Sequence, residues 1–225
     1  MTGYNLPALC RALLFDMDCT LYTHPEYAQA QIDLPVARLA ELRGKSFDEV
    51  SGEVADFRKK WAAKNKGQAI SLGNIFAAFG IPIQESVRWR EELYQPESYL
   101  SRDARLAASL QELSAHFALA VVTNNPAAIA KRTLSVLGVS DFFCAIVGLD
   151  TCFVSKPDKA PFNKAAELCK ADAEACISVG DRYDIDIALP LDMGMGGILV
   201  DGVKDVYKLP DFLHAVGLMP PTSTA

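Results

Sequence analysis

The sequence has no long hydrophobic run and no excess of positive charge. No apolar stretch approaches the roughly 18 residues that a membrane-spanning helix requires, so we expect no membrane partner. The 225 residues carry 22 Lys and Arg against 28 Asp and Glu, a formal net charge of −6 at pH 7. Binding to the phosphate backbone of nucleic acid needs a basic face, and this balance argues against such a partner.

Several common catalytic and metal-binding motifs are also missing. The chain has neither a GxSxG elbow nor a glycine-rich phosphate loop, so serine hydrolases and nucleoside-triphosphate enzymes lack support. Its 3 histidines fit no metal site and no triad, and its 6 cysteines form no CxxC pair. We interpret most cysteines as small buried side chains in a reducing compartment. Because no signal peptide is expected before Asp16, we predict a cytoplasmic protein.

Short apolar runs are present at five places, and helical patterns separate them over the C-terminal part of the chain. The predicted strands are 12–15, 118–122, 144–147, 175–179 and 197–200. Strands that alternate with helices form a parallel sheet through right-handed crossovers. We therefore predict an α/β fold with a doubly wound, five-stranded parallel Rossmann-like core and a frayed tail from Pro220.

Residues 22–98 show helical patterns and no convincing strand. Pro35 is expected to kink or divide the helix predicted over 26–43. Ser46 and Glu49 form a capping box that opens the next helix, in which four apolar positions predict one buried face: Val50, Val54, Phe57 and Trp61. The basic run over 58–66 is interpreted as solvated surface. We predict a core of residues 1–21 and 99–225 with an inserted helical domain, 22–98.

Polar side chains follow four of the predicted strands at their C-terminal ends. They are Asp16 and Asp18 after the first strand, Thr123 and Asn124 after the second, Lys156 after the third, and Asp181, Asp184 and Asp186 after the fourth. Ligands of open α/β sheets bind at this edge. Clustered carboxylates suit Mg²⁺, while a lysine, a hydroxyl and an amide neutralise and bind phosphate. The sequence thus predicts phosphoryl transfer involving a small phosphorylated metabolite.

Each of these residues also has an ordinary structural interpretation. Asp16 and Asp18 fit an acidic turn after a strand, and Lys156 taken alone fits an exposed loop. Asp181 fits a helix N-cap, with further first-turn charges after it. The four groups in this order at strand ends favour a site over these alternatives.

Four segments carry a resemblance to a known family: DMDCTLY (16–22), VVTNN (121–125), SKPDKAPF (155–162) and VGDRYDID (179–186). With them the chain resembles the haloacid dehalogenase superfamily, in its phosphatase branch with an α-helical cap inserted at 22–98. The opening motif and residues 71–81 are similar to those of phosphoglycolate phosphatase and pyrimidine nucleotidase relatives.

The resemblance implies a role for each strand-end residue. Asp16 would be the nucleophile and Asp18 the general acid/base, while Lys156 would pair with the nucleophile and the phosphate. Thr123 and Asn124 would bind phosphate oxygens.

The resemblance also implies a set of metal ligands. Mg²⁺ would be bound by Asp16, by the backbone carbonyl of Asp18, by Asp181 and by Asp186, although Asp184 remains an alternative to Asp186. Cys19 departs from the family's usual Gly or Asn.

A carboxylate at position 18 separates branches of this superfamily. The dehalogenases lack it, whereas an acid here can protonate a leaving oxygen and then activate water. We therefore predict a Mg²⁺-dependent phosphohydrolase that forms an aspartyl phosphate on Asp16. A phosphomutase, a phospho-accepting regulatory domain and a silent binding protein remain alternatives, and the sequence indicates neither the substrate nor the oligomeric state.

Overall fold

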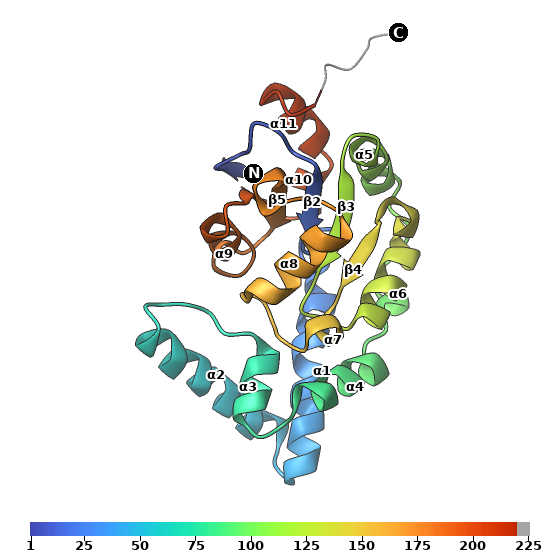
Figure 1. The fold of residues 1–225 in the computed structure, drawn as a ribbon. Coiled ribbons are helices and arrows are strands. Elements are labelled where there is room, and N and C mark those ends of the chain that lie inside the picture. Colours follow the sequence, from blue (N-terminus) through green and yellow to red (C-terminus); the bar gives the residue numbers. More distant parts are fainter. Residues whose placement is uncertain (220–225) are drawn as a thin grey trace.

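A six-stranded sheet forms the centre of the protein in the computed structural model, which describes residues 1–219 (Figure 1). The expected frayed tail from Pro220 lies outside these residues. The strands are β1 (Thr2–Tyr4), β2 (Ala12–Phe15), β3 (Ala118–Val122), β4 (Ala145–Val147), β5 (Cys176–Gly180) and β6 (Gly196–Leu199), in the order β1-β6-β5-β2-β3-β4. The strand β2, which carries the first predicted motif, lies in the middle of this order.

The doubly wound parallel α/β core is confirmed, with one strand more than expected. The five predicted strands pair in parallel, whereas β1 pairs antiparallel with β6 at the sheet edge, with Thr2 opposite Leu199. β1 has only 3 residues, none of them buried. A strand this short and exposed carries no hydrophobic pattern, because its stability comes from pairing with a neighbour.

Helices cover both faces of the sheet. One face packs against α5 (Ala104–Ser114), α6 (Ala127–Leu137), α10 (Val203–Val206) and α11 (Leu209–Ala215). The other packs against α8 (Lys159–Leu168) and α9 (Ala188–Asp192), and α7 (Leu149–Cys152) follows β4. Leu13 and Leu14 of β2 enter opposite clusters, which explains why the central strands are continuous apolar runs.

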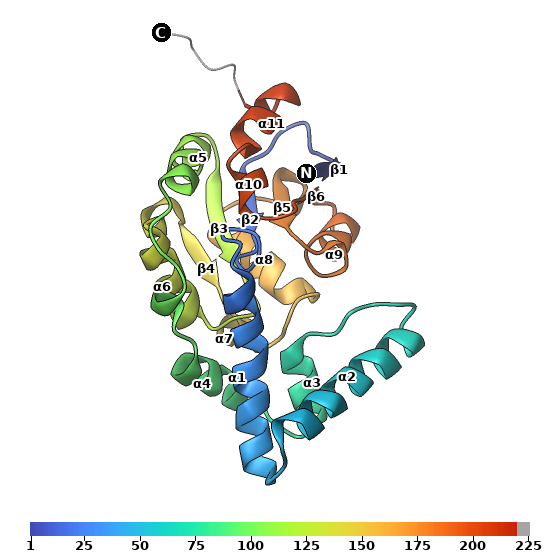
Figure 2. The same ribbon diagram turned by 180° about the vertical axis from the view of Figure 1, so that it is seen from behind.

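Four helices follow β2 and form a separate hydrophobic cluster. They are α1 (Pro25–Arg43), α2 (Phe47–Lys64), α3 (Leu72–Ala78) and α4 (Ile83–Leu93). Trp89, Phe76 and Leu39 are among the buried side chains at its centre. Figure 2 shows α1 running from the sheet into this group. Among the described residues, no helix is both long and apolar enough to cross a membrane.

The prediction that Pro35 divides the first helix into two segments is wrong, and the alternative of a kink stays a prediction. α1 is a single helix with Pro35 inside it. A proline leaves the carbonyl four residues earlier without its helical donor, and that carbonyl belongs to Gln31. The Tyr94 hydroxyl donates to Gln31 O at 2.6 Å, so a side chain distant in sequence replaces the missing bond.

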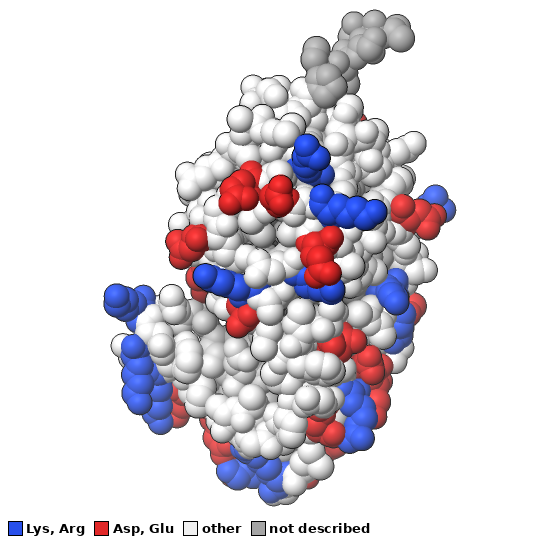
Figure 3. Space-filling view, viewed as in Figure 1, with Lys and Arg blue, Asp and Glu red and all other residues white. Residues whose placement is uncertain are grey.

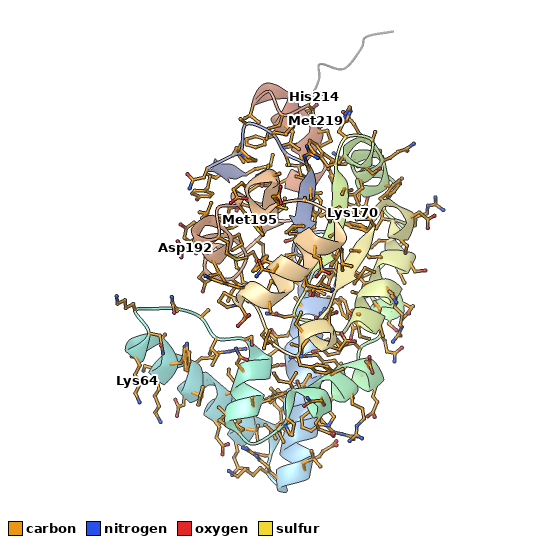
Figure 4. The ribbon with its side chains drawn as sticks, viewed as in Figure 1. Lys64, Lys170, Asp192, Met195, His214 and Met219 are labelled. Carbon is orange, nitrogen blue, oxygen red and sulfur yellow. The ribbon has the colours of Figure 1, made fainter. Side chains whose placement is uncertain are left out.

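The capping box at the start of α2 is confirmed, since Ser46 and Glu49 exchange hydrogen bonds. The predicted buried face holds only for the first half of the helix, because Val50 and Val54 are buried whereas Trp61 is 37% exposed. Of the basic run over 58–66, the four lysines are exposed as expected (Figure 3), whereas Arg58 is half-buried and lines a pocket. Lys64 projects from the outer end of α2 (Figure 4).

Candidate active site

The strand ends bring the predicted side chains together at one edge of the sheet. Asp16 directly follows β2 and Thr123 directly follows β3, and their backbone N–H groups continue the sheet by donating to Val179 O and Val147 O. Asp16, Asp18 and Asp181 line a pocket of about 270 Å³. This volume lies just below the roughly 300 to 1,000 Å³ of pockets that take drug-sized ligands, so the pocket suits a small molecule.

Lys156 forms a buried link between two acids. Its Nζ lies 2.6 Å from Asp16 Oδ1 and 2.7 Å from Asp186 Oδ1, and all three side chains are at most 6% exposed. Burial lowers the pKa of Lys156, but the two carboxylates outweigh that effect and raise it above its ordinary value. The lysine is therefore a fixed cation beside Asp16 and not the exposed loop residue of the alternative interpretation.

Two acids of the site, Asp16 and Asp181, hold protons more strongly than ordinary aspartates. Burial raises the pKa of Asp16 to about 7, against the opposing charge of Lys156 and with further increases from Asp186, Asp18 and Asp181. Burial and the charge of Asp186 raise the pKa of Asp181 to about 6. One lysine thus does not neutralise the group, and a divalent cation would relieve the remaining repulsion.

Three carboxylates offer oxygens that can share one cation. Oxygen atoms of Asp16, Asp181 and Asp186 lie within 4.8 Å of one another, and an all-oxygen donor set fits Mg²⁺. Asp184 is outside this group, and its Oδ2 accepts a hydrogen bond from Ala69 N at 3.1 Å. Between the two acids that the sequence left open, the geometry therefore favours Asp186.

Asp186 is held in place by the backbone around it. It lies in a π-helical turn, η4 (Tyr183–Ile187), where Arg182 N donates to Asp186 Oδ2 at 3.2 Å and Ser178 Oγ donates to Asp186 O at 2.6 Å. A Cβ atom on Gly180 would lie 2.4 Å from Asp186 Cβ. The glycine of the VGD segment therefore allows Asp186 to approach the strand end.

Asp18 faces a network of uncharged donors. Its Oδ1 accepts from Gln31 Nε2 at 2.9 Å and from the Tyr22 hydroxyl, and its Oδ2 accepts from Asn125 Nδ2 at 2.9 Å and from Thr123 Oγ1 at 3.4 Å. Its side chain does not belong to the three-acid group. The carboxylate is thus oriented by hydrogen bonds instead of by an ion pair.

Three members of this network, Tyr22, Gln31 and Asn125, were not among the predicted site residues. Asn125 directly follows the predicted Asn124, and its amide also donates to Gln31 Oε1 at 2.8 Å. Its place in the VVTNN segment could have suggested a role. Gln31 lies within a helix 13 residues after Asp18, where no local pattern distinguishes it from a surface glutamine.

The side chain of Asn124, which we predict to bind phosphate, contacts the backbone of Lys156. Its Oδ1 accepts from Lys156 N at 2.7 Å and its Nδ2 donates to Lys156 O at 3.2 Å. Both polar ends are used in fixing the backbone of Lys156, although Asn124 also lines the pocket. Thr123, which is 2% exposed, donates to Asp18 and accepts from Asn125 N at 3.1 Å.

Cys19 and His24 have structural roles near the site. Cys19 has a φ of 59°, a left-handed conformation that Gly and Asn adopt most easily. This explains why the family usually has Gly or Asn here, and it shows that Cys19 adopts the same kind of backbone conformation. Burial raises the pKa of its thiol to about 11. His24 is the N-cap of α1 and accepts from Tyr27 N at 3.2 Å.

Comparisons with known proteins show which family and fold the chain resembles. A family model described as haloacid dehalogenase-like hydrolase matches residues 10–193. A phosphoglycolate phosphatase of Pectobacterium atrosepticum is 26% identical over 88% of this chain and 92% of its own length. Another, of Psychrobacter arcticus, is 32% identical over 76% of this chain and 75% of its own. The crystal structure of a phosphatase from Thermococcus onnurineus shares the fold, with a TM-score of 0.60 and 19% identity over 90% of this chain and 97% of that one.

Proposed function

The chain belongs to the haloacid dehalogenase-like hydrolase family, and from this premise we propose that it is a Mg²⁺-dependent phosphatase acting on a small phosphomonoester. The observation that carries the proposal is the buried group in which Lys156 forms ion pairs with Asp16 and Asp186. Asp18 is not part of this group and is bound instead by neutral donors such as Gln31. Two carboxylates with different surroundings suit two different chemical roles.

In the proposed reaction, Asp16 is the nucleophile. Its carboxylate oxygen attacks the phosphorus atom, and the bond to the leaving oxygen breaks. Lys156 keeps the Asp16 carboxylate in one orientation and adds positive charge beside the transferred phosphoryl group. A Mg²⁺ ion held by Asp16, Asp181, Asp186 and the Asp18 carbonyl would neutralise the charge on the phosphoryl oxygens.

Asp18 is the proposed general acid and base. In its protonated form it gives a proton to the leaving oxygen, and as a carboxylate it then takes a proton from the water that hydrolyses the aspartyl phosphate. Its position fits this role because Gln31 and Asn125 bind it only through neutral hydrogen bonds. A salt bridge to Asp18 would hold it permanently ionised, and the described residues form none.

We also propose that residues 22–98 act as a cap domain over the site. Nine of its residues line the pocket with the acids of the core, and Gln31, Arg58, Arg90 and Tyr94 are among them. Ala69 N, also within 22–98, donates a hydrogen bond to Asp184 Oδ2 of the core. A cap can exclude water from a labile phosphoenzyme, and its residues would then select the leaving group.

The test is release of inorganic phosphate from a panel of phosphorylated metabolites. Phosphoglycolate is the first candidate because the curated relatives carry that name. EDTA should abolish release and added Mg²⁺ should restore it, while Asp16→Asn should be inactive on every ester. Turnover that is indifferent to chelation, or that persists in Asp16→Asn, would contradict the proposal.

A further inference from the structure

Arg90 is a buried cation at the wall of the active-site pocket. It lies on α4 of the helical segment, is 5% exposed, and lines the pocket together with Asp16 and Asp18. Long cationic side chains are almost never buried this far unless they are paired. A guanidinium at this depth therefore requires a negative charge nearby to compensate it.

No carboxylate within residues 1–219 forms an ion pair with Arg90. Its Nη1 donates to Asn124 O at 3.5 Å, a long contact, and its charge opposes the rise in pKa of the neighbouring Tyr94 hydroxyl. A Cβ atom built on Gly73 would lie 3.4 Å from Arg90 Nη2 and 3.5 Å from Ser155 Oγ. The hydrogen-bond acceptor of the guanidinium, the Asn124 carbonyl, is thus neutral, and the acids that line the same pocket form no ion pair with it.

Neutral acceptors do not compensate a buried charge. Removing a cation from water costs free energy unless an opposite charge and hydrogen bonds replace the lost solvation. The same helix contains a contrasting case, Arg88, which is 65% exposed at its side chain and pairs with Glu85. The exposed arginine has a carboxylate partner and the buried one has none among the described residues, so the partner of Arg90 is expected from outside the chain.

The position of Arg90 bears on the distance between the anionic group that it would bind and the phosphate that reacts at Asp16. The Asn124 residue that accepts from Arg90 also fixes the backbone of Lys156 through its side chain. Lys156 in turn contacts Asp16, the proposed nucleophile. Asn124 therefore contacts both the guanidinium and the lysine at the phosphoryl end of the pocket, and from this we expect the leaving group between them to be short.

We propose that Arg90 is a specificity residue that binds an anionic group on the leaving group of the substrate, so that the enzyme acts on short phosphomonoesters carrying a second negative charge. The second charge is a carboxylate or a second phosphate, since both accept two parallel hydrogen bonds from a guanidinium. Arg58 supports the same chemistry, because it lines this pocket, is half-buried and pairs with no described carboxylate. This proposal rests on the phosphatase function proposed above.

The experiment compares three esters of similar size with the wild-type enzyme and with variants. The esters are phosphoglycolate (carboxylate), a propanediol bisphosphate (second phosphate) and 2-hydroxyethyl phosphate (neutral), with p-nitrophenyl phosphate as a general reporter. Arg90→Met removes the charge, Arg90→Lys keeps it without the planar fork, and Arg88→Met is the matched control on the same helix. Thermal melting of each variant checks folding.

Wild type should prefer at least one anionic ester over the neutral one in kcat/KM. Arg90→Met should lose about 10- to 100-fold for that ester, the value of one charge-assisted hydrogen bond, while the neutral ester changes less than threefold. The kcat/KM of Arg90→Lys for that ester should lie between those of wild type and Arg90→Met, and the kcat/KM of Arg88→Met should match wild type. Which anionic ester responds identifies the second group as carboxylate or phosphate.

Several results would overturn the specificity role. The first is a wild-type preference for the neutral ester. The second is a loss of kcat/KM in Arg90→Met that is equal for all esters, and the third is a loss in Arg88→Met as large as that in Arg90→Met. If Arg90→Met does not fold, the wild-type ranking and Arg90→Lys decide the question. Failure of the phosphatase proposal looks different, because wild type would then release no phosphate from any ester, p-nitrophenyl phosphate included.

Discussion

Replacing Lys156 by methionine removes the cation that compensates two buried acids. Methionine keeps the length and much of the volume of the side chain, so the change is mainly one of charge. Asp16 and Asp186, now 6% and 1% exposed, would lose a partner at 2.6 and 2.7 Å. Breaking a buried ion pair by removing one partner costs about 3–5 kcal/mol. We expect the free energy of unfolding of metal-free Lys156→Met to fall by about this amount at pH 8.

The loss should depend on pH in a defined direction. The pKa of Asp16 is about 7 in the folded metal-free protein and near 4 in an unfolded chain. At pH values between about 4 and 7, Asp16 holds a proton in the folded state and has released it in the unfolded state. The free energy of unfolding therefore falls as pH rises through this range. Without Lys156 the pKa of Asp16 rises further, and the fall continues above pH 7. The variant should therefore lie much closer to wild type at pH 5 than at pH 8.

Urea unfolding in EDTA, followed by far-UV circular dichroism at both pH values, measures this difference. Lys164→Met is the control, since Lys164 pairs with Glu167 on the surface and should cost less than about 1 kcal/mol. Added Mg²⁺ should stabilise Lys156→Met more than wild type, because the cation binds only the folded acids. A loss below about 1 kcal/mol at pH 8, or a loss independent of pH, would refute the view that Lys156 partly compensates the negative charge of Asp16 and Asp186.

Three further substitutions test the surroundings of the acids. Gln31→Leu removes a donor to Asp18 and should lower kcat for p-nitrophenyl phosphate about 10- to 100-fold with little change in Mg²⁺ affinity; an unchanged kcat would exclude a positioning role. Tyr94→Phe leaves Gln31 O without its donor and should cost about 1 kcal/mol in urea unfolding, and a neutral effect would contradict our account of α1. Gly180→Ala places a methyl group against Asp186 and should cost about 1–3 kcal/mol and weaken Mg²⁺ binding in calorimetry, which unchanged affinity would disprove.

The parts of the fold that could be predicted are those that local patterns determine. The central strands are buried on both faces, so each is an apolar run that ends near a polar residue. The polar residues after these strands predicted the acids of the site and Lys156. β1 could not be predicted because its stability depends on pairing with β6. The continuity of α1 through Pro35 could not be predicted either, because the replacement donor, Tyr94, lies 63 residues away from Gln31.

The same distinction applies to the site. The charged residues of the site follow predicted strands, and clustered carboxylates beside a lysine have few possible roles. Their roles could therefore be predicted. The amides are different, since their roles depend on which neighbour the fold brings within reach. The bonds from both ends of the Asn124 side chain to Lys156 could not be predicted, and its binding of phosphate stays a prediction. Gln31 and Arg90 come from helices with no motif, and their significance follows only from burial and contacts in three dimensions.

The central claim is that Asp16 carries the phosphoryl group and Asp18 transfers the proton. Intact-mass spectrometry of Asp18→Asn mixed with acetyl phosphate and Mg²⁺ tests it most directly, because this variant keeps the nucleophile and loses the group that activates water. We expect a mass increase of one phosphoryl group that maps to the peptide containing Asp16, and no increase in Asp16→Asn. Phosphate on any other residue, or a phosphorylated Asp16→Asn protein, would contradict the account.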